Sequence, residues 1–276
     1  MIFRHLTMTI LRQLTTRRHK DNPTHSSTIM RIAIIQSAND IENGRIERQR
    51  AEELISQHSK PGDLWILPEA YDTGWNIKAD DVQLPEPANN EFFTRLSAKH
   101  HIAICGSYYE KLPEGGYSNT FRVVSADSGL NDACAKRHLF GNFEKSSVKP
   151  GNTMLTFTIG EFRLRAVICY DLRFPVWCRN IKDSPYDALL CVSQWPMSRA
   201  GDRNLMLAAR SMENVAYAIS ANALGGSAVY QADGTRDFLM EAGQEIGFYN
   251  LDSNILANFR RHKKYLMDAD YFELRM

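Results

Sequence analysis

A cysteine at the end of an apolar run is the first candidate for chemistry in this sequence. Residues 165–168 read Arg-Ala-Val-Ile and lead into Cys169-Tyr-Asp-Leu-Arg-Phe-Pro175. This pattern presents a thiol as a nucleophile, provided that nearby positive charge or helix N-terminal amides lower its pKa. Pro175 suits the first turn of such a helix. The alternative is a buried structural thiol, because free cysteine packs as a small hydrophobe and Cys105 and Cys191 lie in similar apolar runs.

A carboxylate follows a second apolar run. Residues 63–69 read Asp-Leu-Trp-Ile-Leu-Pro-Glu, so the proline ends a short buried strand and Glu69 stands at its carboxyl end. Ligands of open α/β sheets bind beyond these ends. A glutamate shielded from water there can have its pKa raised toward values useful for proton transfer. An ordinary surface glutamate is the alternative.

A lysine ends a third predicted strand. Ala-Cys-Ala at 133–135 precedes Lys136, and Gly141 and Glu144 follow. An ammonium group at this place could hold an oxyanion or stabilise a thiolate. The alternative is a surface lysine whose stem lies on apolar neighbours.

Together, these three segments resemble the nitrilase superfamily of carbon–nitrogen hydrolases. The resemblance runs from Met30 nearly to the C-terminus and includes Ser193-Gln-Trp-Pro196 and the stretch 208–214, Ala-Ala-Arg-Ser-Met-Glu-Asn. Within the superfamily the chain is most similar to the ω-amidases, which hydrolyse the terminal amide of 2-oxoglutaramate and 2-oxosuccinamate. The match includes the continuation Leu-Arg-Phe-Pro-Val-Trp177 after the cysteine.

The resemblance implies a role for each catalytic residue. Cys169 would be the nucleophile, Glu69 the general base, and Lys136 an oxyanion donor together with the backbone N–H of Tyr170. Glu144 would support Lys136 or the substrate amide. We expect no metal and no cofactor, and the resemblance implies a homodimer or a larger homo-oligomer.

Four further residues are candidates for binding the substrate. Arg173 could hold a carboxylate through two parallel charge-assisted hydrogen bonds, and an internal ion pair is its alternative role. Tyr71, Phe140 and Trp195 adjoin the catalytic segments and could shape a small pocket, although aromatic residues in such places also serve as plain packing.

Composition bounds the partners and the compartment. The net charge is +1, so no concentrated basic face for nucleic acid is expected. The sequence carries no glycine-rich nucleotide-binding motif and no paired Cys or His spacing for zinc. Five cysteines without Cys-x-x-Cys pairs favour a reducing compartment, and therefore the cytoplasm. Residues 214–232 carry no charge, but their polar residues indicate a core segment and not a membrane span.

The element pattern predicts one α/β domain over residues 30–276. We expect strands at 32–35, 64–67, 102–105, 121–124, 166–169, 188–192 and 216–221. The clearest helix would place Leu205, Ala208, Ala209, Met212 and Ala216 on one apolar face. The resemblance to the nitrilases resolves this mixture into an αββα four-layer sandwich.

Residues 1–29 are basic and rich in Ser and Thr, as in an organelle transit peptide. We interpret them as a non-essential N-terminal extension, whose deletion leaves activity intact.

The sequence leaves alternative functions open. A deaminated glutathione amidase or an N-carbamoyl amino acid amidohydrolase would use the same three catalytic residues. A catalytically silent interaction protein with the nitrilase fold is the alternative from another class, but it would have no physical reason to keep Glu69, Lys136 and Cys169 together.

Overall fold

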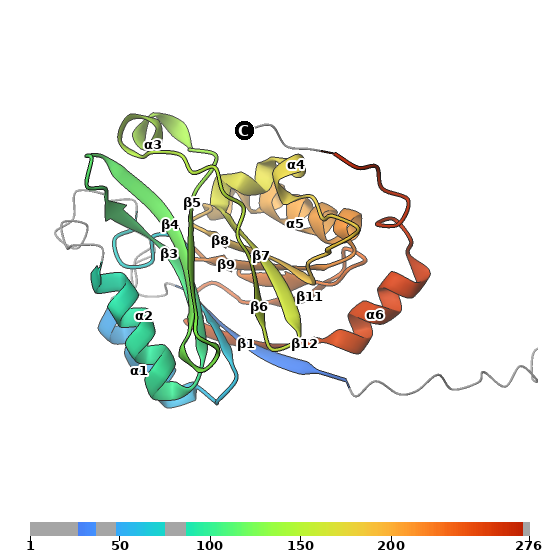
Figure 1. Ribbon diagram of the computed structural model, residues 1–276, viewed down its shortest axis with the longest axis horizontal. Coiled ribbons are helices and arrows are strands. Elements are labelled where there is room, and N and C mark those ends of the chain that lie inside the picture. Colours follow the sequence, from blue (N-terminus) through green and yellow to red (C-terminus); the bar gives the residue numbers. More distant parts are fainter. Residues whose placement is uncertain (1–26, 37–47, 75–86, 273–276) are drawn as a thin grey trace, which may run out of the picture.

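Two six-stranded sheets form the centre of the computed structural model, which describes residues 27–36, 48–74 and 87–272 (Figure 1). The predicted extension at residues 1–29 lies almost wholly outside the described residues. Strand order is β12-β1-β2-β3-β4-β5 in the first sheet and β11-β10-β9-β8-β7-β6 in the second. In each sheet three neighbouring strands are parallel, β1, β2 and β3 in the first and β7, β8 and β9 in the second. Their carboxyl ends are where α/β sheets place ligands.

Helices and strands alternate along much of the chain. The first half contains β1 (Ile29–Ile35), α1 (Arg48–His58), β2 (Leu64–Ile66), α2 (Pro87–His100), β3 (Ala103–Lys111), β4 (Tyr117–Ser125), η2 (Ala126–Ser128), β5 (Leu130–Ala135) and α3 (Gly141–Ser147). The second half contains β6 (Thr156–Ile159), β7 (Phe162–Ile168), η3 (Cys169–Arg173), α4 (Pro175–Cys178), β8 (Ala188–Ser193), η4 (Met197–Arg199), α5 (Ala200–Asn214), β9 (Tyr217–Asn222), β10 (Ala228–Tyr230), β11 (Arg236–Leu239), β12 (Ile246–Asp252) and α6 (Ser253–His262).

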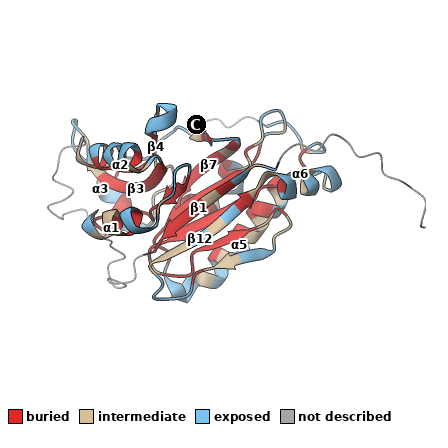
Figure 2. Cartoon of the chain, turned by 90° about the horizontal axis from the view of Figure 1, so that it is seen from below, coloured by how far each residue is buried: buried red, intermediate tan, exposed pale blue. Residues whose placement is uncertain are grey.

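The alternation of side chains along the strands builds the layers. In β1, Ile32 and Ile34 point into the core between the two sheets, whereas Ala33 and Ile35 join the cluster under α1 and α2. On the other side of the molecule α5 packs on β9 and β10. Figure 2 shows the strands buried and the helices exposed on their outer faces. The fold is therefore the predicted αββα sandwich.

Each predicted strand corresponds to a strand of the structure, with ends shifted by a few residues. The uncharged segment 214–232 is also a core segment, because it supplies the buried strands β9 and β10. No helix of the described residues is long and apolar enough to cross a bilayer.

The predicted apolar face of α5 is wrong. Leu205 is 73% exposed, Met212 is 44% exposed, and Ala216 lies beyond the helix. The buried face instead carries two arginines. Arg203 donates to the carbonyls of Gly225 and Gly226 at 3.1 and 2.8 Å, and Arg210 donates to the carbonyl of Leu172 at 3.2 Å. Buried carbonyls in turns need donors, and these guanidinium groups supply them.

Candidate active site

The candidate site lies where the carboxyl ends of strands from both sheets meet. Glu69 follows β2, and Lys136 follows β5, both in the first sheet. Cys169 follows β7 and Gln194 follows β8, both in the second sheet. Each of these four side chains is therefore placed by the end of a strand, as the apolar runs predicted for Glu69, Lys136 and Cys169.

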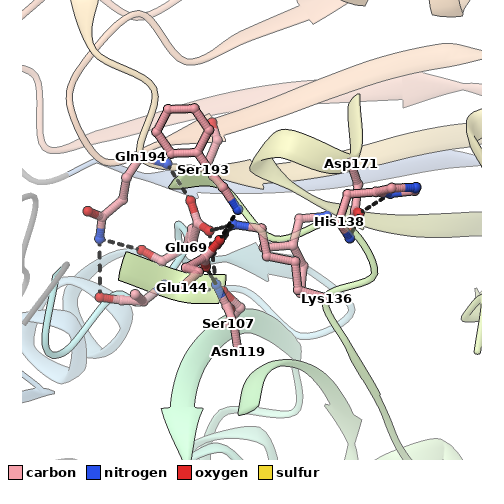
Figure 3. A network of polar contacts seen from close by, with 12 residues as sticks. Glu69, Ser107, Asn119, Lys136, His138, Glu144, Asp171, Ser193 and Gln194 are labelled. Carbon is pink, nitrogen blue, oxygen red and sulfur yellow. Dashed lines mark hydrogen bonds and ion pairs between the residues drawn. The ribbon is translucent and has the colours of Figure 1, made fainter. Parts of the chain in front are cut away.

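A lysine between two carboxylates forms the centre of the site (Figure 3). Lys136 Nζ donates to Glu69 Oε1 at 2.8 Å and to both carboxylate oxygens of Glu144 at 2.9 Å. All three residues are at most 3% exposed. The ammonium group thus donates to both carboxylates, and the buried charges are paired as their desolvation requires.

Neutral donors also bind these carboxylate oxygens. Asn119 Nδ2 bridges the two carboxylates, at 3.0 Å from Glu69 Oε1 and 3.2 Å from Glu144 Oε1. The Tyr109 hydroxyl donates to Glu144 Oε1 at 3.1 Å, and the backbone N–H of Phe140 donates to Glu144 Oε2 at 2.7 Å. These contacts fix both carboxylates with respect to Lys136.

Gln194 connects this cluster to the second sheet. Its backbone N–H donates to Glu69 Oε2 at 3.0 Å, and its side-chain Nε2 donates to the Glu69 carbonyl at 2.8 Å. Because Gln194 directly follows β8, these bonds hold Glu69 against the sheet that carries Cys169.

The electrostatics of the site favour a charged lysine and a neutral thiol. Burial lowers the pKa of Lys136, but the negative charges of Glu69, ionised Cys169 and Glu144 raise it well above its ordinary value. Burial and then Glu69 raise the pKa of Cys169 well above its ordinary value, although Lys136 and a backbone N–H of Gln194 act in the opposite direction. The sequence-based expectation of a lowered thiol pKa does not match this finding, because Cys169 is only 7% exposed and faces a carboxylate.

The backbone around Cys169 forms a strained turn. Cys169 has a φ of 47°, in the left-handed region that non-glycine residues rarely adopt. The residue opens η3, and Pro175 stands in the first turn of the separate helix α4, as its sequence position predicted. N–H groups in the first turn of a helix have no intrahelical acceptor, which leaves the N–H of Tyr170 available to a ligand.

A small pocket lies over the thiol. The space inside it, part of which is open to solvent, has a volume of about 290 Å³. Its lining contains three aromatic side chains and two arginines and consists of Phe140, Cys169, Tyr170, Arg173, Gln194, Trp195, Pro196 and Arg199. The pocket therefore suits a small anionic molecule with its reactive carbon near Sγ.

The two arginines differ in their partners. Arg173 donates to Asp202 at 2.9 Å and lies over the Trp195 ring at 4.9 Å from its centroid. Arg199 lies over the Phe140 ring at 5.9 Å. Arg173 therefore lines the pocket and also forms an ion pair, with an exposed aspartate and not an internal one.

Comparison with known families agrees with this geometry. The profile of the carbon-nitrogen hydrolase family matches residues 31–257. The chain belongs to this family.

Similar curated proteins of the family are described as amidases. An omega-amidase, YafV, of Yersinia enterocolitica is 34% identical over 174 residues, which cover 63% of this chain and 66% of that protein. YafV of Escherichia coli K12 is 33% identical over 164 residues, with 59% and 62% covered. A 2-oxoglutaramate amidase of Bacillus subtilis is 24% identical over 182 residues, with 65% and 70% covered. The chain spans slightly less than two thirds of the first two relatives.

Solved structures of carbon-nitrogen hydrolases share the fold. XC1258 from Xanthomonas campestris, described as a CN-hydrolase superfamily protein with an arsenic adduct in the active site, is 28% identical. The match covers 90% of this chain and all of that one, with a TM-score of 0.80. Nit3 of Saccharomyces cerevisiae is 22% identical, covers 85% and 94%, and has a TM-score of 0.70.

The structure of this carbon-nitrogen hydrolase brings together all but one of the predicted site residues. Glu69, Lys136 and Glu144 form the charged cluster, and Cys169, Tyr170, Arg173, Phe140 and Trp195 line the pocket. The exception is Tyr71. The chain turns at Ala70, with a φ of 45°, and Tyr71 packs instead in the outer cluster, where its hydroxyl donates to Asn89 at 2.6 Å.

The sequence did not single out Asn119, Gln194 or Arg199. Asn119 lies within β4, where a polar residue on a strand carries no distinguishing signal, whereas Gln194 stood inside the quoted segment 193–196. Among the described residues, no group of three or more His, Cys, Asp or Glu side chains is placed to hold a metal ion.

Proposed function

We propose that this protein hydrolyses the terminal amide of small 2-oxo dicarboxylic acid monoamides, such as 2-oxoglutaramate and 2-oxosuccinamate, to the acid and ammonia through a cysteine thioester. The observation that carries the proposal is the buried Lys136 ammonium held by Glu69 and Glu144 beside the pocket that Cys169 lines. The similarity to omega-amidases supports the substrate class.

The first step is attack by the sulfur of Cys169 on the amide carbon. Because the thiol is neutral at rest, Glu69 takes its proton as the C–S bond forms, and the carbonyl oxygen becomes an oxyanion. The backbone N–H of Tyr170 and the ammonium of Lys136 stabilise that oxyanion. Each such donor contributes about 3 kcal/mol in other hydrolases.

Proton transfer also changes the contacts of Lys136. In the resting site Lys136 donates to both Glu69 and Glu144. Protonation removes the charge of Glu69 and weakens its hydrogen bond to Lys136, whereas Glu144 stays ionised and keeps its hydrogen bonds to Lys136. An ammonium N–H that was bonded to Glu69 can therefore donate to the oxyanion when it forms. Glu144 holds Lys136 in place throughout, and Glu69 exchanges its place as acceptor with the oxyanion.

The remaining steps return the enzyme to its resting state. Glu69 gives its proton to the departing nitrogen, the C–N bond breaks, and ammonia leaves. Glu69 then takes a proton from a water molecule that attacks the thioester. The C–S bond breaks, Glu69 returns its proton to the sulfur so that the thiol is restored, and the product acid leaves.

Arg173 is the proposed ligand of the substrate carboxylate. It lines the pocket, and its guanidinium carbon lies over the Trp195 ring at 4.9 Å from the centroid, a contact that restricts the motion of the side chain.

Turnover of four candidate substrates tests the function. Purified protein is incubated with 2-oxoglutaramate, 2-oxosuccinamate, deaminated glutathione and an N-carbamoyl amino acid, and ammonia and carbon dioxide are measured. We expect ammonia from the two 2-oxo amides, no carbon dioxide, and complete loss of turnover in Cys169→Ala with an unchanged circular dichroism spectrum. Higher turnover of deaminated glutathione would replace the proposed substrate, and residual turnover in Cys169→Ala would remove Cys169 from its role.

We also propose a cytoplasmic homodimer. All five cysteines are free, which agrees with a reducing compartment. The dimer is proposed by analogy with the family, and light scattering of the purified protein measures it directly.

A further inference from the structure

A histidine and an aspartate link the lysine segment to the cysteine turn. His138 lies two residues after Lys136, and Asp171 lies two residues after Cys169. Asp171 Oδ1 accepts from both the backbone N–H and Nδ1 of His138, each at 2.8 Å. Because the carboxylate is an acceptor, Nδ1 carries the proton. Figure 3 shows this pair beside the Lys136 cluster.

The same carboxylate also braces the strained turn. Asp171 Oδ2 accepts from the backbone N–H of Ile168 at 3.1 Å, directly before Cys169. A left-handed non-glycine residue costs about 1–3 kcal/mol and persists only when its surroundings hold it. Asp171 is 2% exposed, so its hydrogen bonds are shielded from water. One buried carboxylate therefore fixes both the conformation of the cysteine turn and its position against the lysine segment.

Ring stacking strengthens the link. The His138 ring stacks on Phe174 with 3.5 Å between centroids and an interplanar angle of 8°, and it meets Trp177 edge-on at 5.8 Å. Both aromatic residues follow the cysteine in sequence. His138 thus contacts the segment after the thiol through a hydrogen bond and through its ring face.

We propose that His138 and Asp171 form a clasp that sets the distance between Lys136 and Cys169. The two residues lie in segments that follow strands of different sheets, β5 and β7, and the clasp joins these segments next to the reacting groups. His138 and Asp171 are positioning residues, because they act through Lys136 and Cys169 and not on the substrate. The inference rests on the proposed function, in which Lys136 stabilises the oxyanion formed at Cys169.

Two substitutions of His138 isolate the hydrogen bond. Both His138→Asn and His138→Gln lose the stacked ring, but only asparagine places an amide donor where Nδ1 stood. We expect kcat of the glutamine variant to fall by about 10²-fold with little change in KM, because misplacement of about 1 Å is enough for such a loss. The asparagine variant should recover about tenfold or more of this loss. His138→Phe, which keeps the stacking and lacks the donor, should behave like the glutamine variant.

A distant ion pair provides the stability control. Arg260 Nη1 contacts Asp187 at 2.7 Å, at the opposite end of β8 from Gln194. Arg260→Met should lower the melting temperature and leave kcat unchanged. Equal kcat in the asparagine and glutamine variants, or full kcat in His138→Phe, would overturn the clasp.

A chemical readout separates the two proposals. If the wild-type protein releases no ammonia from any substrate, the proposed function fails. The rate of Cys169 alkylation by iodoacetamide still tests the clasp, because the charge of Lys136 favours the thiolate that reacts. The clasp then predicts slower alkylation in His138→Gln than in His138→Asn, and equal rates would refute it.

Discussion

Replacing Lys136 with methionine tests how the two buried carboxylates are kept together. Glu69 Oε1 and Glu144 Oε1 lie at 2.8 and 2.9 Å from Lys136 Nζ. Two carboxylates about 5 Å apart repel each other by about 3 kcal/mol at an effective dielectric constant of about 20. Removing one partner of a buried ionic group costs about 3–5 kcal/mol. We therefore expect Lys136→Met to lower the free energy of unfolding at pH 7 by about 3–5 kcal/mol.

The loss should depend on pH and on Glu144. Without Lys136 the folded site favours proton uptake by one carboxylate, and the unfolded chain does not, so the stability of the variant rises relative to wild type as the pH falls from 7 to 5. The double variant Lys136→Met, Glu144→Gln should be more stable at pH 7 than Lys136→Met by about 2–3 kcal/mol, because its second charge is gone.

Urea unfolding at pH 7 and pH 5, followed by circular dichroism, measures these differences. Lys149→Met is the matched control, since Lys149 pairs with Glu114 at 3.2 Å on the surface and its removal should leave the midpoint unchanged. A double variant that is less stable than Lys136→Met at pH 7 would refute the reasoning, because repulsion between Glu69 and Glu144 would then not dominate.

Three further predictions concern binding, the thiol and a close backbone contact. Arg173→Lys should reduce kcat/KM for amides with a carboxylate far more than for neutral amides, because lysine cannot form the planar pair of bonds; equal losses would exclude the carboxylate role. Since burial and then Glu69 raise the pKa of Cys169, its alkylation at pH 8 should be slower than that of free cysteine and should still increase above pH 9. Glu69→Gln should accelerate the alkylation of Cys169. A wild-type alkylation rate that levels off below pH 8 would contradict the raised pKa of this thiol. A Cβ on Gly151 would lie 2.3 Å from the carbonyl oxygen of Ala135, so Gly151→Ala should displace the end of β5 and reduce both the melting temperature and kcat. Gly201→Ala in α5, which meets nothing within 4 Å, should stabilise the protein by up to about 1 kcal/mol and serves as the control.

The sequence predicts the strand ends of the site well. Apolar runs placed Glu69 and Cys169 at strand ends, because a run of that length reads as a buried strand. Lys136 was placed by a small-residue strand, whose residues are mostly exposed or half-buried. The convergence of these three residues was not in the pattern. It depends on the packing of two sheets, and the resemblance to the nitrilases supplied that packing.

Contacts between distant segments account for the sequence-based errors. Apolar spacing alone placed Leu205 and Met212 on the inner face of α5, whereas buried carbonyls select Arg203 and Arg210 for that face. Tyr71 was assigned to the pocket by its nearness to Glu69 in sequence, and one left-handed residue between them directs it elsewhere. Asn119 could not be distinguished from any other polar strand residue until Glu69 and Glu144 lay beside it.

The division of the reacting groups between the sheets has a consequence for unfolding. Glu69 and Lys136 belong to one β-layer and Cys169 to the other, so neither layer alone contains a complete site. On heating, separation of the layers inactivates the protein even while each retains its hydrogen-bonded strands. Loss of turnover should then precede loss of the far-ultraviolet dichroism signal. The turnover rate is therefore a sensitive measure of how well the two layers are packed together.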